Sequence, residues 1–341
     1  MDSRQLVSEA MQGKAGQIPI YFWLADPELE AKVGDIVGVR CWFKRFEFLE
    51  KGGPFKRGPE TRREWCDRLQ PDEHEWPTVS ELLNEMDEVV ADTAKVDRSK
   101  SFQLEILGPT EYSEYSCSSG KTAEARRLDQ VTHQFDFSIL TVLDPRKADM
   151  IHKRFFDILR EVVKQAVKYE TIDSIRIADD FCTYSGSIYR PDFTERILRR
   201  QTELGRTIVQ GGKFSVFHGD GDVRKYLAVL AGAYSGLHPL DVRSKSTLSD
   251  AREWATALRE VRRVLPETVF FTGIPIDLLC SSDVSASQLV GVVKHVIDSV
   301  GKDRLILTTT HRPYPGWSFR DFEQKAYAVK RFLETIAPST M

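Results

Sequence analysis

The second half of the chain repeats one pattern, in which a short apolar run is followed by a stretch long enough for an amphipathic helix. The predicted strands cover residues 174–178, 213–217, 269–273 and 304–308, with a shorter run at 236–240. Strands that alternate with helices of this length form parallel β/α units, because a parallel strand needs a long crossover connection. The second half is therefore predicted to be α/β.

Acidic and imidazole side chains gather where these strands end: Asp179, Asp180, His218, Asp220, His238 and His311. In a (β/α)8 barrel such ends meet at one mouth, whereas in an open doubly wound sheet they spread along a crevice. No G-x-G-x-x-G motif follows a first strand and no Walker loop is present, which disfavours nucleotide binding. We predict an α/β fold with a single (β/α)8 TIM barrel over residues 1–341 and N-terminal excursions.

The first half of the chain is less regular. Residues 18–23 and 101–107 predict strands, while residues 36–42 fit either a strand or a helix-to-loop junction. Residues 50–76 are charged and rich in Gly and Pro, which predicts an exposed excursion, and residues 126–143 are ambiguous.

Two helix starts carry clear signals. Thr78 and Glu81 form a capping-box pattern, and Asp144-Pro145 opens a long helix.

Composition narrows the classes of partner. The chain is 41% hydrophobic and 29% charged, and its net charge of -3, without a strongly basic segment, argues against nucleic acid or an anionic membrane. No apolar run is long enough for a bilayer and the first residues lack a signal core, so we expect a cytoplasmic protein. The five cysteines lie far apart without a C-x-x-C pair, which indicates reduced thiols.

Residues 213–224 carry the most specific local signal, because an apolar strand pattern runs directly into a polar, glycine-containing end. Side chains alternate along a strand, so His218 and Asp220 point the same way and can share a target. Gly219 and Gly221 permit unusual backbone angles or the close approach of a ligand. The alternative is a hydrophilic turn in which His218 satisfies a local hydrogen bond.

Short motifs recur in order along the C-terminal half: Ala178-Asp179-Asp180-Phe181, Arg190-Pro191-Asp192-Phe193, Phe217-His218-Gly219-Asp220, Gly236-Leu237-His238-Pro239-Leu240, Gly273-Ile274-Pro275 and Thr310-His311-Arg312-Pro313. As an ordered set at β/α spacing, they resemble the uroporphyrinogen decarboxylase superfamily. That superfamily includes the decarboxylase of haem synthesis and corrinoid-dependent methyltransferases acting on methanol, methylamines and methoxylated aromatics. The resemblance implies a (β/α)8 barrel with its site at the mouth formed by the strand carboxyl ends.

Two departures from the superfamily pattern change the expected chemistry. The decarboxylases carry an arginine-rich motif after the first strand, but residues 22–26 contain no arginine here, so uroporphyrinogen is not the expected substrate. The zinc methyltransferases of methanol and methylamine metabolism carry His-x-Cys at the place of His218 and a second Cys near Thr310. This chain has Asp220 and Thr310 instead, so a metal would be held by nitrogen and oxygen.

The strand-end pattern and the resemblance together nominate the site residues. The candidate catalytic residues are His218, Asp220, Asp180, His311 and Tyr112, and the candidate metal ligands are His218, Asp220 and Glu111. Asp179 and the thiols of Cys182 and Cys280 are further candidates. Each has a structural alternative: Glu111 and Tyr112 would lie in a polar loop, His311 would cap or stack, and His238 before Pro239 is interpreted as structural.

The leading hypothesis is a methyltransferase that demethylates a small methoxylated or methylated substrate and passes the methyl group to a corrinoid, with Zn²⁺ or acid/base chemistry at His218 and Asp220. A corrinoid carrier protein and a second copy in a homodimer are the protein partners that this hypothesis allows. The alternatives are a decarboxylase of a smaller acid and a non-catalytic barrel that binds a corrinoid or tetrapyrrole.

Overall fold

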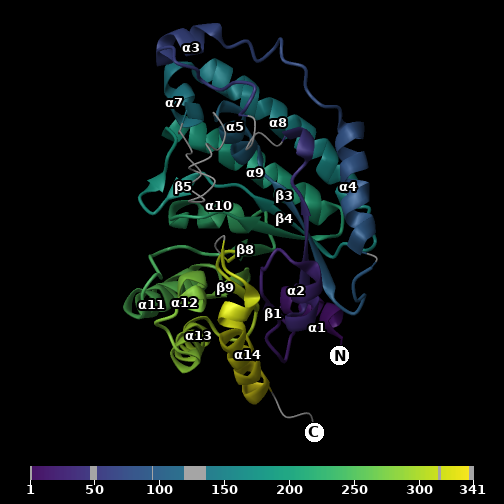
Figure 1. The fold of residues 1–341 in the computed structure, drawn as a ribbon, viewed down its shortest axis with the longest axis vertical. Coiled ribbons are helices and arrows are strands. Elements are labelled where there is room, and N and C mark those ends of the chain that lie inside the picture. Colours follow the sequence, from purple (N-terminus) through teal and green to yellow (C-terminus); the bar gives the residue numbers. More distant parts are fainter. Residues whose placement is uncertain (1, 47–51, 94, 119–135, 314–315, 338–341) are drawn as a thin grey trace.

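The computed structural model of the chain describes residues 2–46, 52–93, 95–118, 136–313 and 316–337. Its centre is a barrel of parallel strands with helices around the outside (Figure 1). The barrel strands are β1 (Ile20–Tyr21), β2 (Ile36–Cys41), β3 (Ser101–Leu107), β4 (Ser174–Ala178), β7 (Phe214–His218), β8 (Gly236–His238), β9 (Val269–Ile274) and β10 (Leu305–Thr309).

The strands follow one another around the barrel in chain order. From β2 to β10 each strand pairs in parallel with the next, and β10 pairs back with β1. Between β1 and β2 the described residues form no ladder, so the barrel is nearly closed. The predicted (β/α)8 TIM barrel is confirmed, and residues 36–42, which the sequence left open, supply strand β2.

Helices of very different length cover the barrel. They are α1 (Ser3–Met11), α2 (Pro27–Val33), α3 (Arg62–Arg68), α4 (Val79–Thr93), α5 (Pro109–Cys117), α7 (Asp136–Leu143), α8 (Pro145–Ala166), α9 (Pro191–Gln210), α10 (Leu227–Ala231), α11 (Leu248–Val264), α12 (Ile276–Cys280), α13 (Ala286–Val300) and α14 (Phe319–Ile336). Short 3-10 turns occur at η1 (Lys44–Phe46) and η2 (Arg224–Tyr226), and β5 (Cys182–Thr183) with β6 (Gly186–Ser187) forms a small hairpin.

Both predicted helix starts are confirmed by their caps. The Asp144 side chain accepts the Lys147 amide at 3.1 Å before α8. Before α4, the Thr78 hydroxyl accepts the Glu81 amide at 3.3 Å and the Glu81 carboxylate accepts the Thr78 amide at 2.9 Å. These bonds satisfy amides that the helix itself leaves unpaired.

The two sides of the barrel wall differ in polarity. Leu104, Ile106, Ile175 and Ile177 belong to the large core that lies between the strands and the surrounding helices. Side chains alternate along a strand, so the intervening positions of β3 and β4 face the barrel interior. At the amino end of the barrel, α1 contributes Val7, Ala10 and Met11 to a second apolar cluster that also contains strand residues Val216, Phe271 and Ile306.

Strand register places charged interior residues side by side. Arg40 of β2 lies opposite Glu105 of β3, which lies opposite Arg176 of β4. Nearer the carboxyl ends, His218 of β7 lies opposite His238 of β8. Register therefore builds a charged layer in the middle of the barrel and an imidazole pair above it.

Two N-terminal segments are more ordered than a polar loop or an exposed excursion. Residues 111–115 lie in helix α5, so the polar-loop alternative for Glu111 and Tyr112 does not hold: Pro109 at the first helical turn starts a helix directly after β3. The segment 52–76 is not simply exposed: its Arg62, Arg63 and Arg68 face solvent, but Phe55 and Trp65 are buried, with the Trp65 indole donating to the Phe55 carbonyl at 2.8 Å. Residues 50–51 of the predicted excursion lie outside the described residues. Of the ambiguous segment 126–143, residues 126–135 also lie outside them, and residues 136–143 form α7.

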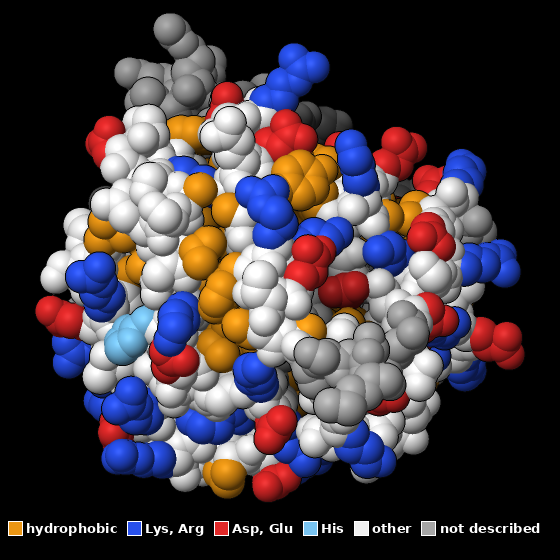
Figure 2. All heavy atoms as spheres, turned by 90° about the horizontal axis from the view of Figure 1, so that it is seen from below, with side chains coloured by type: hydrophobic (Ala, Val, Ile, Leu, Met, Phe, Trp, Pro, Cys, Tyr) orange, Lys and Arg blue, Asp and Glu red, His pale blue; other side chains and the backbone are white. Residues whose placement is uncertain are grey.

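Figure 2 shows one face of the molecule, on which Lys and Arg side chains are interspersed with Asp and Glu side chains. Within the described ranges, every helix is too short or too polar to traverse a lipid bilayer.

Candidate functional site

Three side chains that could hold a metal ion converge at the carboxyl ends of β4 and β7. One atom each from Asp180, His218 and Asp220 lies within 4.8 Å of the other two. His218 Nε2 is 3.9 Å from Asp220 Oδ1, and the Asp220 amide donates to Asp180 Oδ1 at 2.7 Å. We call these three residues the acidic cluster.

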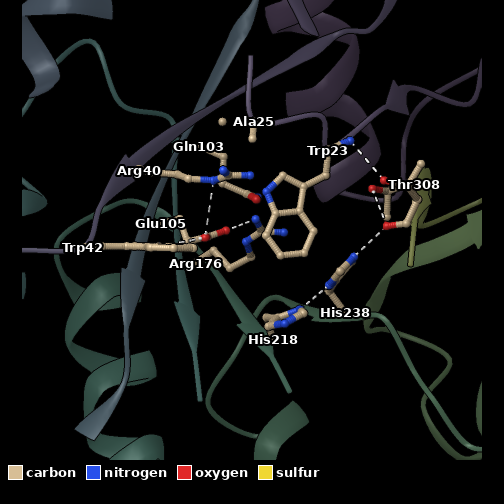
Figure 3. A network of polar contacts seen from close by, with 12 residues as sticks. Trp23, Ala25, Arg40, Trp42, Gln103, Glu105, Arg176, His218, His238 and Thr308 are labelled. Carbon is tan, nitrogen blue, oxygen red and sulfur yellow. Dashed lines mark hydrogen bonds and ion pairs between the residues drawn. The ribbon is translucent and has the colours of Figure 1, made fainter. Parts of the chain in front are cut away.

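The hydrogen bonds behind His218 determine which of its nitrogens faces the acidic cluster (Figure 3). His238 Nε2 lies 3.0 Å from the carbonyl oxygen of Thr309, which can only accept, so this nitrogen carries the proton. In the neutral ring His238 Nδ1 is then an acceptor, and it pairs with His218 Nδ1 at 2.5 Å. His218 therefore donates through Nδ1 and presents an unprotonated Nε2 toward Asp220.

The electrostatics agree with neutral imidazoles. Burial, reinforced by His238 and Arg176, lowers the pKa of His218 well below its usual range. Burial and Arg176 do the same to the pKa of His238. A neutral imidazole with a free lone pair is the form that ligates a metal or accepts a proton.

The pKa values of the carboxyl groups in the cluster shift in the opposite direction, upward. Burial, together with the nearby Asp241, raises the pKa of Asp180 to about 6. Burial and the carboxylates of Asp180 and Asp241 raise the pKa of Asp220 well above its usual range. Lys245, which lines the adjacent cavity, forms its ion pair with Asp241, and among the described residues no Lys or Arg forms an ion pair with Asp180 or Asp220.

A cavity of about 330 Å³ opens beside the cluster. Its walls include Asp220, Asp241, Lys245, Asp277 and His311, which follow the carboxyl ends of four different strands. This is the arrangement that places an active site at the strand carboxyl ends of a (β/α)8 barrel.

The remaining predicted residues occupy different places. His311 lines the cavity, and its Nδ1 donates to the Arg312 carbonyl at 2.8 Å. Glu111 lies beside the cluster, where its carboxylate accepts the Asp180 amide at 3.2 Å. Tyr112 lies apart from the cavity, against Phe46 and Phe155.

Asp179 has a structural task. Its carboxylate accepts the amides of Thr110 and Glu111 at 2.8 and 2.9 Å and the Thr110 hydroxyl at 2.8 Å, and Gln201 also donates to it. It thereby caps α5 from a neighbouring strand, with no acceptor capacity turned toward the cavity. Adding a Cβ at Gly108 would bring it within 2.3 Å of the Asp179 carboxyl carbon, so glycine is required there.

The thiol candidates do not join the cluster. Cys182 lines the cavity, but burial raises its pKa to about 12, which keeps the thiol protonated. Thr310 also lines the cavity, and its hydroxyl accepts the Ile276 amide at 3.2 Å where α12 begins.

Sequence reasoning missed the charged layer below the imidazole pair. Arg176 pairs with Glu105, Arg40 Nε lies 3.8 Å from the same carboxylate, and the Trp42 indole donates to it at 3.1 Å. Trp23 lies between this layer and the histidines, with its ring centroid 4.1 Å from Arg176 Cζ and 5.3 Å from the His218 ring (Figure 3). The available signal was a single charged residue inside each of three otherwise apolar strand patterns.

The acidic cluster fits a divalent cation in its donor chemistry. Two carboxylate oxygens and one imidazole nitrogen are ligands that Zn²⁺ and related transition-metal ions accept. The second nitrogen of His218 is already fixed by His238, as the ring of a metal-ligating histidine is in most proteins. Asp180 and Asp220 are half-buried, and among the described residues neither forms an ion pair with a Lys or Arg, so a bound metal would supply the missing charge.

Fold and site together define a (β/α)8 barrel with a carboxylate and imidazole site at the strand carboxyl ends. Its fold is similar to that of a methyltransferase from Methanosarcina mazei, with a TM-score of 0.66 over 97% of this chain and 99% of that one, at 12% identity. More distant matches are a GH5-4 broad-specificity endoglucanase from Clostridium acetobutylicum (TM-score 0.46, 11% identity, 99% and 100% covered) and a modular endo-β-1,4-mannanase from Cellulomonas fimi (0.47, 12%, 95% and 74%). No protein-family model matches the sequence, and neither does any curated protein.

Proposed function

We propose that this protein is a methyltransferase that removes a methyl group from a small methoxylated or methylated substrate and passes it to a corrinoid or its carrier protein. The observation that carries the proposal is the acidic cluster beside an open cavity, with His218 Nε2 unprotonated and aimed at Asp220. The fold shared with a methyltransferase of Methanosarcina mazei is consistent with it.

Asp180, His218 and Asp220 would hold a divalent metal, with Zn²⁺ as the expected ion. Such an ion supplies Lewis acidity, which makes the oxygen of a methyl ether a better leaving group. In this reaction the bond between methyl carbon and oxygen breaks, the oxygen keeps the electron pair, and the methyl group goes to the acceptor. His238 fixes the His218 ring through their shared hydrogen bond, and His311 and Lys245 line the cavity in which the oxygen gains its proton.

The test combines metal analysis with a methyl-transfer assay. The purified protein is expected to bind close to one equivalent of Zn²⁺ and to demethylate methoxylated aromatics in the presence of cob(I)alamin. Asp220→Asn keeps the side-chain volume but removes a ligand charge, so metal content and turnover should both fall to background. Asp222→Asn is the matched control, because Asp222 pairs with Arg224 at 2.6 Å outside the cluster.

Three results would count against the proposal. Absence of both bound metal and methyl transfer would refute it. Carbon dioxide release from an aromatic or tetrapyrrole acid, unaffected by a chelator, would indicate a decarboxylase instead. Tight corrinoid binding that survives His218→Ala and Asp220→Ala without any turnover would indicate a non-catalytic carrier.

A further inference from the structure

The barrel is joined differently between β1 and β2, where the described residues form no ladder. We call this junction the seam. At its amino end, the Asp35 amide donates to the Ile20 carbonyl at 2.8 Å and the Ile20 amide donates to the Asp35 carboxylate at 2.9 Å. Further along, the described residues form no backbone hydrogen bond across the seam, so a side chain has to connect the two strands there.

Glu30 of α2 makes that connection. Its Oε1 accepts the Leu24 and Ala25 amides at 2.7 and 2.9 Å, and its Oε2 accepts the Gly38 amide at 2.7 Å. Leu24 and Ala25 follow β1, whereas Gly38 lies within β2, so one carboxylate joins both sides of the seam. Glu30 is 1% exposed, so its carboxylate has little contact with water.

The loop after β1 is strained and has room to move. Ala25 has a φ of 66°, in the left-handed region that a residue with a Cβ enters at a cost. A cavity of about 250 Å³ lies against the seam, and its walls include Ala25, Gly38 and Arg40. The loop can therefore relax once its bonds to Glu30 are weakened.

Trp23 directly precedes the two loop amides that are bound at the seam. Its ring centroid lies 5.3 Å from that of His218, 5.8 Å from that of His238 and 5.5 Å from that of His311. Figure 3 shows the indole beside the first two of these rings. The Trp23 amide also donates to Thr309 Oγ1 at 3.0 Å. The seam therefore borders the residue that packs against all three histidines of the candidate site.

The ionisation state of Glu30 determines how many amides it can accept. Burial raises the pKa of Glu30 to about 7, against the lowering effect of its three amide partners and Arg40. The titratable and charged groups that interact with it are Tyr21 of β1, Arg40 of β2 and Arg176 of β4. Oε2 has one amide to lose and Oε1 has two, so the proton is expected on Oε2, where it faces the Gly38 amide.

Protonation weakens the remaining bonds as well, because charge-assisted hydrogen bonds are about twice as strong as neutral ones. The barrel itself stays folded, since a proton that the fold holds more tightly than the unfolded chain does not destabilise the fold. The expected change is therefore local to the seam and to the loop that carries Trp23.

We propose that Glu30 is a positioning residue for the candidate site, which closes the seam and holds Trp23 against the histidines while it is ionised and releases the loop when it is protonated. The packing beneath the site is then tight in neutral to alkaline solution and loose in mildly acidic solution. Neither a metal nor a corrinoid takes part in this switch, so it goes beyond the proposed function.

Hydrogen exchange of individual amides between about pH 5.5 and about pH 8.5, corrected for the intrinsic exchange rate, tests the proposal in the wild-type protein. Protection of the Leu24, Ala25 and Gly38 amides should fall by about tenfold as the pH drops through about 7, the loss expected for a hydrogen bond to a charged group. Amides of β4, which pair within the barrel, should keep their protection.

Glu30→Gln mimics the protonated form at every pH, because its amide oxygen can accept but its NH₂ group faces the Gly38 amide. Its three seam amides should be poorly protected even at about pH 8.5 and should show no pH dependence. Glu28→Gln, an exposed position of the same helix, is the matched control and should behave like the wild-type protein.

Acrylamide quenching of Trp23 fluorescence gives a spectroscopic reading that a purely structural Glu30 would not change with pH. The Trp23 signal is the difference between each protein and its Trp23→Phe counterpart. Quenching should rise several-fold below about pH 7 in the wild-type protein and should be high at every pH in Glu30→Gln.

Two results would overturn the proposal: a wild-type protein whose seam amides and Trp23 signal do not respond to pH, or a pH response that persists in Glu30→Gln and so comes from the histidines. If Glu30→Gln does not fold, the wild-type exchange data decide. A loss confined to the three seam amides supports the proposal, and a loss shared with β4 contradicts it. Failure of methyl transfer would leave these results unchanged, and a seam that does not respond to pH would leave the proposed function standing.

Discussion

The acidic cluster at the barrel mouth and the charged layer in the middle of the barrel compensate their charges differently. At the mouth Lys245 forms an ion pair with Asp241, and among the described residues no Lys or Arg forms one with Asp180 or Asp220. In the charged layer below, Arg40 and Arg176 share the carboxylate of Glu105. Trp23 lies between the charged layer and the pair of His218 and His238 (Figure 3). The comparison teaches that strand register pairs charges inside the barrel, whereas two acids at the mouth are left without an ion-pairing Lys or Arg among the described residues.

The acidic cluster and the charged layer also differ in which part of the fold supplies their residues. The acids follow the strands and lie in loops, whereas Arg40, Glu105 and Arg176 are in-register neighbours within three strands. A change on the acidic side is therefore expected to affect ligands first, while a change in the charged layer affects the stability of the barrel itself.

Glu105→Gln should have the largest effect on stability. It removes the carboxylate shared by two buried guanidinium groups, and loss of one partner of a buried ion pair costs about 3–5 kcal/mol. Chemical denaturation would measure the loss. Asp222→Asn, which removes one partner of a surface pair, should change stability by less than about 1 kcal/mol. Equal effects of the two variants would mean that the charged layer is solvated.

The protonation state of Glu30 changes the net charge around Arg40 near neutral pH. Its carboxylate accepts the amides of Leu24, Ala25 and Gly38 at 2.7–2.9 Å, yet burial raises its pKa to about 7. The folded state then holds this proton more tightly than the unfolded chain does. Stability should therefore fall as pH rises from about 4.5 to about 7, by about 3 kcal/mol for this group, and the contribution should level off above that.

Denaturation curves at several pH values, compared between the wild-type protein and Glu30→Gln, would isolate the Glu30 contribution. The variant lacks the titrating proton, so its stability should depend less steeply on pH within this window. Parallel pH profiles for the two proteins would show that Glu30 is already ionised in the fold.

The smallest expected effect concerns the hydrogen bond behind His218. In His238→Leu nothing accepts the His218 Nδ1 proton, so Zn²⁺ affinity should fall by about tenfold, as for other residues that orient a metal-ligating histidine. In His238→Asn the amide oxygen can accept that proton and affinity should largely return. Competition with a chromophoric chelator measures both. Equal losses in the two variants would assign His238 a packing role alone.

Much of the fold could be predicted because strand and helix periodicities are local. Residues 101–107 and 174–178 alternate as strands and form β3 and β4 with those bounds, and Asp144-Pro145 starts α8. Residues 36–42 stayed open, since a short apolar run fits a buried strand or a helix junction equally well. Residues 50–76 were predicted to be an exposed excursion because their charges outnumber the few aromatic residues, of which Phe55 and Trp65 pack inward.

The candidate site was predictable to the extent that strand ends meet at one mouth. That rule nominated Asp180, His218 and Asp220, which the structure places within 4.8 Å of one another. The same rule nominated Asp179. The sequence around Asp179 does not show that its carboxylate caps α5, because the amides it accepts belong to Thr110 and Glu111, far away in the chain. Arg40 and Arg176 went unnoticed, because one charge inside an apolar strand has no meaning until its neighbours across the sheet are known.

The sequence by itself determined a parallel β/α barrel and the chemical groups available at its mouth, because hydrophobic periodicity and strand-end polarity are properties of consecutive residues. The tertiary structure alone decided how those groups are paired. Strand register and packing between distant segments determine the hydrogen-bond chain from His218 through His238 to the Thr309 carbonyl. They also determine that two arginines share Glu105 and that the Tyr112 hydroxyl is left unpaired. Register is a long-range property, so hydrogen-bond partners and charge compensation become known once the barrel is closed.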